Sequence, residues 1–482
     1  MTKDMTQGSP VRLILTFSLP LLIGNIFQQL YNMVDTMIVG RFVSTQALAG
    51  VGSTGAISFL IMGFAMGVTS GFSVVVAQRF GAGDEKGVRN AVAMAAYLCV
   101  GLAVVMTLVS TLATRPLLLL MNTPADMYDY AYDYIFTIFA GMAAPIFYNL
   151  LAGILRALGD SRTPLYFLIL SSLLNVGLDL LFILSFHAGV VGAAVATVIS
   201  QVVSGLLCLA YMAKRFPILR FRKEDWRVNW RLIGLHLKIG LPMAFQFSIT
   251  AIGVMAIQGA INNFGSSAAA GYTAASKVEQ ICTQPMNTFG VTMATYAGQN
   301  LGAGRIDRVK QGVWKCAVLS TVVSIAVTLL VFVAGGWFVT LFVGGEEPEV
   351  MRYALQYMRT TSVLYFMLGL LYVFRNALQG MGASMVTLLG GGIELVLRTV
   401  IAFVLPPLIG FAGICVAGPS AWIGASVPLM IVFLILIPRY ERQYARPGGV
   451  NRPDGTNRPD GTAKPAAEEE PAPEPASSGS AK

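Results

Sequence analysis

Residues 78–83 read Gln-Arg-Phe-Gly-Ala-Gly, and residues 299–304 repeat the pattern as Gln-Asn-Leu-Gly-Ala-Gly. Three further pairs of short stretches follow the same order at an offset of 221 to 223 positions. These pairs are Leu19-Pro20 with Leu241-Pro242, Ala47-Leu-Ala-Gly50 with Ala268-Ala-Ala-Gly271, and Leu155-Arg-Ala-Leu-Gly-Asp-Ser161 with Leu378-Gln-Gly-Met-Gly-Ala-Ser384. Matches that share one offset indicate an internal repeat, so we expect two halves, about residues 12–225 and 232–440.

The chain is strongly apolar. Of its 482 residues 55% are hydrophobic and 12% are charged, and the mean hydropathy is +0.67, whereas a soluble domain carries about 25% charge. Apolar runs of about 18 residues or more recur along the chain and predict an all-α, polytopic membrane protein. We expect twelve spans near residues 13–40, 50–78, 90–113, 128–157, 163–187, 190–214, 235–262, 271–300, 311–335, 352–380, 385–408 and 412–438.

Each half then holds six spans, so both halves begin on the same side of the membrane. The two six-helix bundles are expected to be related by a pseudo-two-fold axis along the membrane normal, with a cleft between them. We expect residues 1–225 to form the N-terminal bundle with its linker and residues 226–440 the C-terminal bundle. Residues 441–482, rich in Pro, Gly, Ala and Glu, have the composition of a disordered cytoplasmic tail.

Lysine and arginine gather in the loops on the side of the N-terminus, above all in the linker from Lys214 to Arg231, and we place Arg375 among them. The opposite side has only Arg41, Arg115, Arg352 and Arg359, and the acidic stretch 346–349. The positive-inside rule therefore predicts that both termini are cytoplasmic. The net charge of +9 is explained by topology, so we expect the lipid bilayer and not nucleic acid as a partner.

Enzyme chemistry is not expected. The sequence has no phosphate-binding glycine loop followed by Lys-Ser/Thr, no zinc spacing and only two histidines. Its five cysteines fall inside expected spans without paired spacing, so they are expected to be buried small apolar residues. We expect no cofactor beyond a coupling ion.

Asp35 lies inside the first apolar run, within the stretch from Asn25 to Gly40. An ionisable group near the bilayer centre costs roughly 2.5–3.5 kcal/mol on insertion scales, and such groups are usually retained for proton relay, ion binding or substrate pairing. Six charged residues lie well inside the expected spans: Asp35, Asp179, Lys277, Glu279, Glu394 and Arg398. Counted along the expected helix directions, all six avoid the inner half, which predicts a polar cavity that opens outward.

Asn175 and Asp179 are four residues apart, hence on one helix face, and Asp35 is expected at a similar depth. Two carboxyl groups in a low dielectric repel each other, which favours the protonated form of one of them. We therefore expect Asp35, Asn175 and Asp179 to form the cation-coupling site, with a possible Na⁺ bound to the same residues. The alternative is that both acids are hydrogen-bonded packing polars, with Asp179 wet at the surface.

A substrate cavity is predicted less sharply. Its candidates are Gln28, Tyr31, Asn32, Lys277, Glu279, Glu394 and Arg398. Glu394 and Arg398 are four residues apart and equally suit a self-neutralising intrahelical pair. The polar residues that precede Asp35 could instead join neighbouring helices. At the repeat offset the counterpart of Asp35 is uncharged, so the acid pair is expected in the N-terminal half alone.

These motifs resemble those of the multidrug and toxic compound extrusion (MATE) family, bacterial branch. The resemblance rests on the repeated stretches, on Thr163-Pro164 and on Asn175-Val-Gly-Leu-Asp179, and it covers residues 10–440. It implies export of bulky, often cationic drugs or metabolites in exchange for protons or sodium, by a monomer in the bacterial plasma membrane. Members carry coupling residues that map onto Asp35, Asn175 and Asp179. Some have a glutamate in span seven, where this chain has Gln246, Ser248 and Thr250, which favours the N-terminal acids.

The leading hypothesis is thus a secondary antiporter. Cation binding at Asp35 and Asp179 would bend the first span, aided by Pro20, and release substrate outward. The alternative is a flippase for lipids or lipid-linked oligosaccharides of the same superfold, which Lys277 and Arg398 leave open because such substrates carry phosphates. A channel or receptor is a third reading, although the repeat argues for two rocking halves.

Overall fold

The structure, a computed structural model, describes residues 4–121, 123–343 and 347–444. The expected tail, 441–482, lies outside these residues except for its first four, which end the last helix. The described residues form helices and no strand. The helices of the N-terminal half are α1 (Pro10–Phe42), α2 (Thr45–Ser53), α3 (Gly55–Gly81), α4 (Glu85–Leu120), α5 (Ala125–Ala140), α6 (Ala143–Ala157), α7 (Arg162–Leu180) and α8 (Gly189–Arg215).

The C-terminal half repeats this order. Its helices are α9 (Trp230–Ile261), α10 (Ser266–Cys282), α11 (Gln284–Gly302), α12 (Ile306–Val343), α13 (Pro348–Ser362), α14 (Tyr365–Gly380), α15 (Ser384–Val404), α16 (Pro406–Ile409) and α17 (Phe411–Tyr444). Among the described residues nine helices are long and apolar enough to cross a membrane, or up to eleven spans if each of two bent pairs counts as one. The expected span 271–300 is divided between α10 and α11, and each expected span coincides with a helix or a broken pair.

The repeat extends to the places where helices break. α5 and α6 meet at 50° and α13 and α14 at 53°, and the breaks at 141–142 and 363–364 are 222 positions apart. Gly83 and Gly304 both take positive φ values, 65° and 72°, a conformation that costs glycine little. The all-α membrane fold and the internal repeat predicted from the sequence are therefore confirmed, including the positions of the helix breaks.

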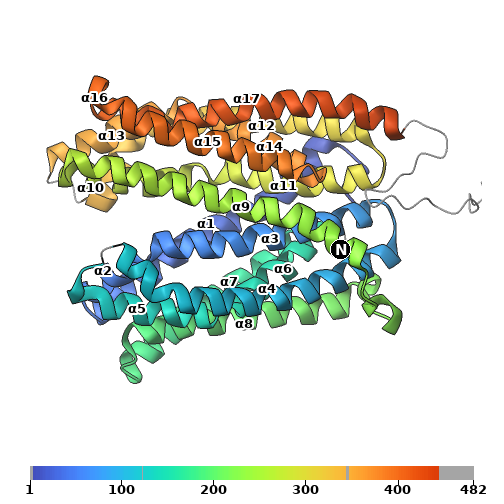
Figure 1. The fold of residues 1–482 in the computed structure, drawn as a ribbon, viewed down its shortest axis with the longest axis horizontal. Helices are drawn as coiled ribbons and strands as arrows, with labels where there is room; N and C mark the ends of the chain where they lie inside the picture. Colours follow the sequence, from blue (N-terminus) through green and yellow to red (C-terminus); the bar gives the residue numbers. More distant parts are fainter. Residues whose placement is uncertain (1–3, 122, 344–346, 445–482) are drawn as a thin grey trace, which may run out of the picture.

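The two halves form separate layers, with α2–α8 in one and α10–α17 in the other, while α1 and α9 contribute to both (Figure 1). Each has its own apolar core, but α1 belongs to both. Ile14 and Phe17, near its start, pack into the core of the C-terminal half, together with Met5, which precedes the helix. Ile38 and Val39, at its end, pack within the N-terminal half. Helix α1 therefore connects the halves along its length.

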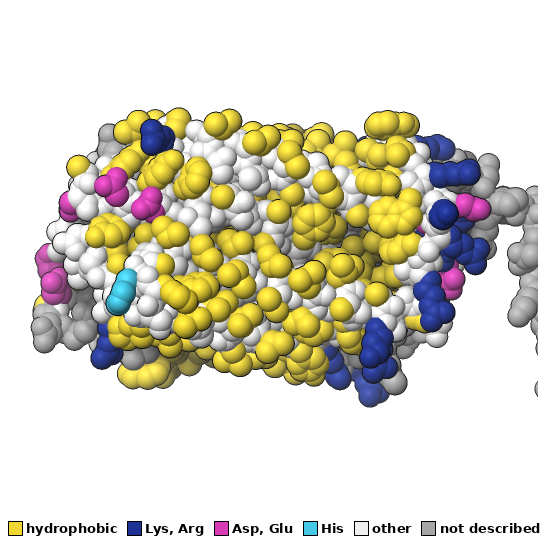
Figure 2. All heavy atoms as spheres, turned by 90° about the horizontal axis from the view of Figure 1, so that it is seen from below, with side chains coloured by type: hydrophobic (Ala, Val, Ile, Leu, Met, Phe, Trp, Pro, Cys, Tyr) yellow, Lys and Arg dark blue, Asp and Glu magenta, His cyan; other side chains and the backbone are white. Residues whose placement is uncertain are grey.

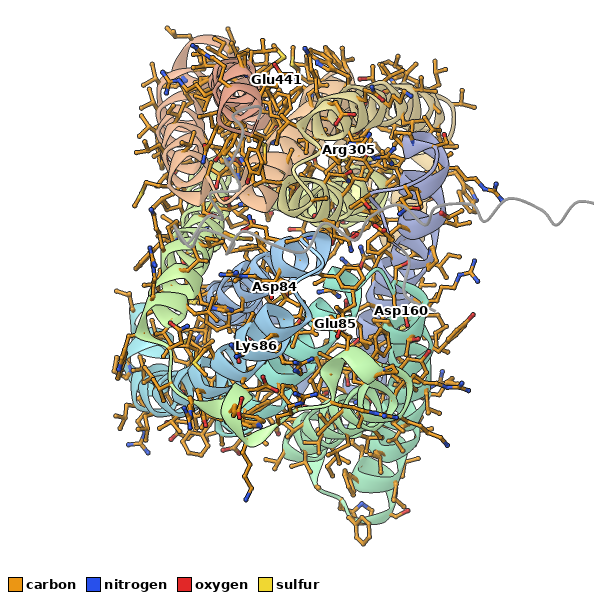
Figure 3. The ribbon with its side chains drawn as sticks, turned by 90° about the vertical axis from the view of Figure 1, so that its right-hand side faces the viewer. Asp84, Glu85, Lys86, Asp160, Arg305 and Glu441 are labelled. Carbon is orange, nitrogen blue, oxygen red and sulfur yellow. The ribbon has the colours of Figure 1, made fainter. Side chains whose placement is uncertain are left out.

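On the face shown in Figure 2, apolar side chains cover the middle of the molecule, and Lys and Arg gather at the end that holds the N-terminus. We call this end the basic end. Figure 3, which faces it, shows Lys86 and Asp160 in one half and Arg305 and Glu441 in the other. The apolar surface includes Leu112, Leu120 and Val333, which are 78%, 78% and 88% exposed. Such a surface fits lipid contact better than water.

The repeated motif of residues 78–83 and 299–304 joins the halves at the basic end. Gln78 Nε2 donates to Gly380 O, and Gln299 Nε2 donates to Ala157 O, both at 2.8 Å. Gly81 and Gly302 lie so close to the backbone carbonyls of Gln299 and Gln78 that neither has room for a Cβ. We call this two-fold set of contacts the basic-end seam.

The N-terminal segment also lies across the seam. The Met5 backbone N–H donates to Gln299 Oε1 at 2.9 Å, and Arg308 Nη2 donates to Gly8 O at 2.9 Å. The side chain of Met5 is fully buried. Any movement that separates the halves at the basic end must therefore break these contacts.

We predict that Gly81→Ala and Gly302→Ala each destabilise the protein by about 1–3 kcal/mol, because a Cβ at either position forces the two backbones apart. Thermal unfolding of the purified variants in detergent measures this. Gly101→Ala is the matched control: it lies in α4 with nothing within 4 Å of its Cβ, and alanine should stabilise the helix slightly there. Equal melting temperatures for all three variants would contradict the seam as described.

Candidate functional site

Asp35 and Asp179 lie side by side in the N-terminal half. Asp35 is near the end of α1 and 8% exposed, and Asp179 is near the end of α7 and 0% exposed. The two carboxyl groups are close enough to interact electrostatically. Two carboxylates at short range in a low dielectric repel each other, so a proton or a cation shared between them is favoured. The idea that Asp179 is wet at the surface is wrong, because α1 and α8 cover it.

Asn175 lies one helical turn before Asp179 and is the third residue of the site. With its amide nitrogen turned toward Asp179, it donates to Asp179 Oδ2 at 3.3 Å, and its oxygen accepts from the backbone N–H of Thr197 at 3.2 Å. This orientation is chosen by the hydrogen bonds it makes. The structure thus brings together the three residues that the sequence nominated for cation coupling.

Three hydroxyl groups surround the acids. Tyr31, on α1, is hydrogen-bonded to Thr197 of α8 and is close enough to Asp35 to interact electrostatically. Tyr134, on α5, is close to Asp35, Asp179 and Tyr31. Tyr134 and Thr197 were missed by sequence reasoning. Tyrosines occupy every second position from 128 to 134, and Thr197 is one small polar residue in an apolar run, so a single sequence carries no signal for either.

The site has carboxylate oxygens that are free to bind a cation. Asp35 Oδ1 and Asp179 Oδ1 are buried and have no hydrogen-bond partner among the described residues. A buried polar atom without a partner is costly, so a ligand that supplies a partner is favoured. A proton shared between the two acids satisfies this need, and so does Na⁺, a hard cation that prefers oxygen ligands.

The charges of the C-terminal half are arranged differently. Glu394 Oε1 accepts from Arg398 Nη2 at 2.6 Å, and Glu394 Oε2 accepts from Arg375 Nη2 at 2.5 Å. All three side chains are buried. We call them the Arg–Glu–Arg triad. The intrahelical pair that the sequence allowed is thus present, with a second arginine added from α14.

The placement of Arg375 in a cytoplasmic loop is wrong. It lies within α14, five residues before the helix ends, and is 5% exposed. In the sequence Arg375 lies near the end of an apolar run. A lone arginine is costly inside a membrane span, so a loop position was expected. The carboxylate of Glu394, nineteen residues further along the chain, removes that cost.

The other cavity candidates are not assembled into one site. Glu279 is half-buried, accepts from the Tyr357 hydroxyl at 2.9 Å and interacts electrostatically with Arg398. Lys277 is exposed. Gln28 and Tyr31 are half-buried and Asn32 is exposed along α1. The outward-opening polar cavity therefore stays a prediction.

Comparison with known proteins gives consistent matches over most of the chain. The MatE family model matches residues 20–181 and 242–404, one segment in each half. The chain is 30% identical over 386 residues to the Bacillus subtilis protein named "Probable multidrug resistance protein YpnP", covering 79% of this chain and 85% of that one. It is 29% identical to a second B. subtilis protein, "Probable multidrug resistance protein YoeA", over 76% of this chain and 80% of the relative.

A solved structure described as "MATE in complex with MaL6" superimposes with a TM-score of 0.85 at 23% identity, covering 92% of this chain and 100% of that one.

We predict that Glu394→Ala lowers stability by about 3–5 kcal/mol, because it leaves two buried guanidinium groups without a carboxylate. Thermal unfolding in detergent measures the effect. Glu349→Ala is the control, since Glu349 also pairs with an arginine, at 3.8 Å, but is 71% exposed and should change stability by about 1 kcal/mol or less. A Glu394→Ala protein as stable as Glu349→Ala would contradict the triad.

Proposed function

Because the chain belongs to the multidrug and toxic compound extrusion family, we propose that it is a secondary antiporter that exports drugs or organic, often cationic, metabolites in exchange for protons or sodium ions. Membership makes the chain a multi-pass membrane transporter rather than an enzyme. The exchanged ion, the substrate class and the direction of transport belong to the proposal.

The observation that carries the proposal is the buried contact between Asp35 and Asp179, each with one oxygen free. With a proton on one acid, the pair has a single negative charge. With a cation bound to both carboxylates, the proton must leave. A site that binds a proton and a second cation with lower affinity together than separately exchanges one for the other. Such exchange is the basic requirement of coupled transport.

Helix α1 is the element that would transmit occupancy of the site to the rest of the protein. It carries Asp35 near one end, while Asn25 Nδ2 donates to Thr288 Oγ1 of the C-terminal half at 3.1 Å. Pro20 lies inside the helix and has no N–H to complete the backbone ladder. We infer that binding of a cation at Asp35 shifts α1 about this weak point and changes how the halves meet.

The flippase alternative has less support. It needs cationic groups for a phosphate, and of the two candidates from the sequence Arg398 is committed to Glu394, whereas Lys277 is exposed. The relatives are named as multidrug resistance proteins, which supports small organic substrates. We also propose that the basic end faces the cytoplasm of a bacterial cell, so that both termini are cytoplasmic, and that the protein works as a monomer.

We predict that Asp35→Asn and Asp179→Asn abolish gradient-driven transport, because an amide cannot exchange a proton for a cation. Wild type and variants are reconstituted into liposomes, and uptake of a fluorescent cationic dye is followed under an imposed proton or sodium gradient. The matched control is Asp133→Asn, an exposed acid on α5 next to Tyr134, which should transport like wild type.

Wild-type transport by folded Asp35→Asn would refute the proposed coupling site. Transport of a fluorescent phospholipid in place of the dye would instead support the flippase.

A further inference from the structure

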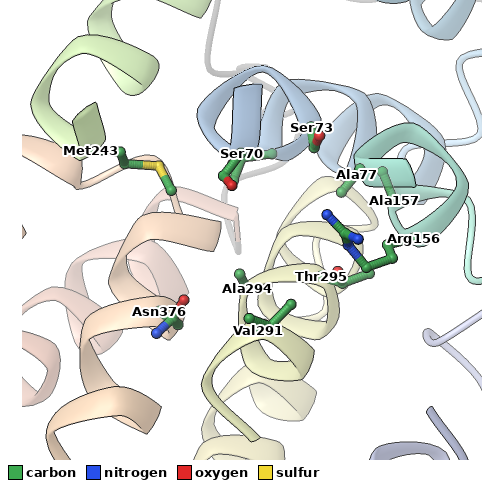
Figure 4. Close-up of a pocket in the computed structure, with 12 residues that line it drawn as sticks. Ser70, Ser73, Ala77, Arg156, Ala157, Met243, Val291, Ala294, Thr295 and Asn376 are labelled. Atoms are coloured by element: carbon green, nitrogen blue, oxygen red, sulfur yellow. The ribbon is translucent and has the colours of Figure 1, made fainter. Parts of the chain in front are cut away.

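A second polar feature lies at the basic-end seam, away from the acid pair. The structure outlines a cavity of about 60 Å³ between the halves (Figure 4). Ser70, Ser73 and Arg156 line it from the N-terminal half, and Thr295 and Asn376 line it from the C-terminal half. Drug-sized pockets measure about 300–1,000 Å³, so this cavity suits only a small ion with water.

The Arg156 guanidinium points into this cavity (Figure 4), and no hydrogen bond or ion pair is recorded for it within the described parts of the chain. Its electrostatic neighbours are Tyr148 and Cys208, both uncharged. Asp160, one turn further along, is already engaged: its carboxylate accepts from the Thr163 hydroxyl at 2.6 Å and from the backbone N–H groups of Arg162 and Thr163. The positive charge of Arg156 is therefore uncompensated.

Other arginines in the interior show what such a charge normally requires. Arg375 and Arg398 share Glu394, and Arg308 donates to Asn300 Oδ1 and to the carbonyls of Met5 and Gly8. Arg156 instead has five donors that face a space with hydroxyl groups and an amide. Gly153 keeps this space open, because a Cβ there would overlap the Ser73 hydroxyl and lie 3.7 Å from Arg156 Nη2.

We propose that the cavity at Arg156 binds a small monovalent anion such as chloride, which bridges Arg156 of the N-terminal half to Thr295 of the C-terminal half, beside it in Figure 4. The side chain of Arg156 is half-buried, and the anion supplies its missing counter-charge through charge-assisted hydrogen bonds. Because its ligands come from both halves, it binds the closed basic-end seam and loses half of its ligands when the seam opens.

A ligand that binds one of two conformations shifts the population toward that conformation. Chloride therefore favours the state in which the basic end is closed. This effect depends on Arg156 and not on the acid pair, so it holds whichever ion drives transport and even if the proposed antiport fails.

The test measures the distance across the seam as chloride varies. Lys86 and Lys310 are exposed at the basic end, one in each half, and are changed to cysteine for paired spin labels. Cys282, which is half-buried, is replaced by serine, while the other four cysteines are buried. Electron–electron resonance distances are recorded in detergent as chloride replaces gluconate, an anion too large for the cavity, at constant sodium and pH.

We expect the short-distance population of the parent protein to grow with chloride and to saturate. Arg156→Gln should raise the chloride midpoint by about tenfold or more, the scale of one lost charged hydrogen bond, and Arg156→Lys should retain part of the response. Arg12→Gln, an equal loss of charge at an exposed basic-end position, should respond like the parent protein.

If Arg156→Gln does not fold, Thr295→Val removes a hydroxyl donor beside Arg156 and leaves the cation in place, and it should weaken the response. No chloride response in the parent protein would overturn the proposal. So would a response that is equal in the parent protein, Arg156→Gln and Thr295→Val.

Discussion

Two carboxyl groups buried against each other cannot both be ionised unless a cation lies between them. Asp35 and Asp179 are held in that position by the packing of α1 on α7, and each has one oxygen without a partner. The repulsion between them at short range in a low dielectric is several times larger than in water. The proposed coupling requires that the pair hold either a shared proton or a bound cation, and that the helices around it accommodate both.

The two halves share one fold, but their buried carboxyl groups have different partners. In the C-terminal half Glu394 is bonded to two arginines, so it has no need of an exchangeable ion. Within the part of the N-terminal half that the structure describes, no arginine interacts electrostatically with Asp35 or Asp179. Helix α1 links this site to the C-terminal half through Asn25. A seam with contacts from both halves and an ion site in one half are what the proposed antiport requires.

Much of the fold could be predicted, because the bilayer forces its spans to be apolar and the repeat shows how they are grouped. The breaks at 141–142 and 363–364 could not, since neither carries proline and each depends on packing within its half. Those residues of the site that are costly to place in lipid, such as Asp35, could be predicted from the sequence. Tyr134 and Thr197 are ordinary in a span and become informative only when helix rotation places them. Arg375 was misplaced because its partner lies on another helix.

The central claim is that Asp35 and Asp179 share one exchangeable proton. It is tested most directly by titrating the purified protein with a sodium salt or a cationic substrate in weakly buffered detergent solution while proton release is recorded. The account predicts release of about one proton per molecule on binding, and none from Asp35→Asn. Saturable binding without proton release, or equal release from Asp35→Asn, would contradict it.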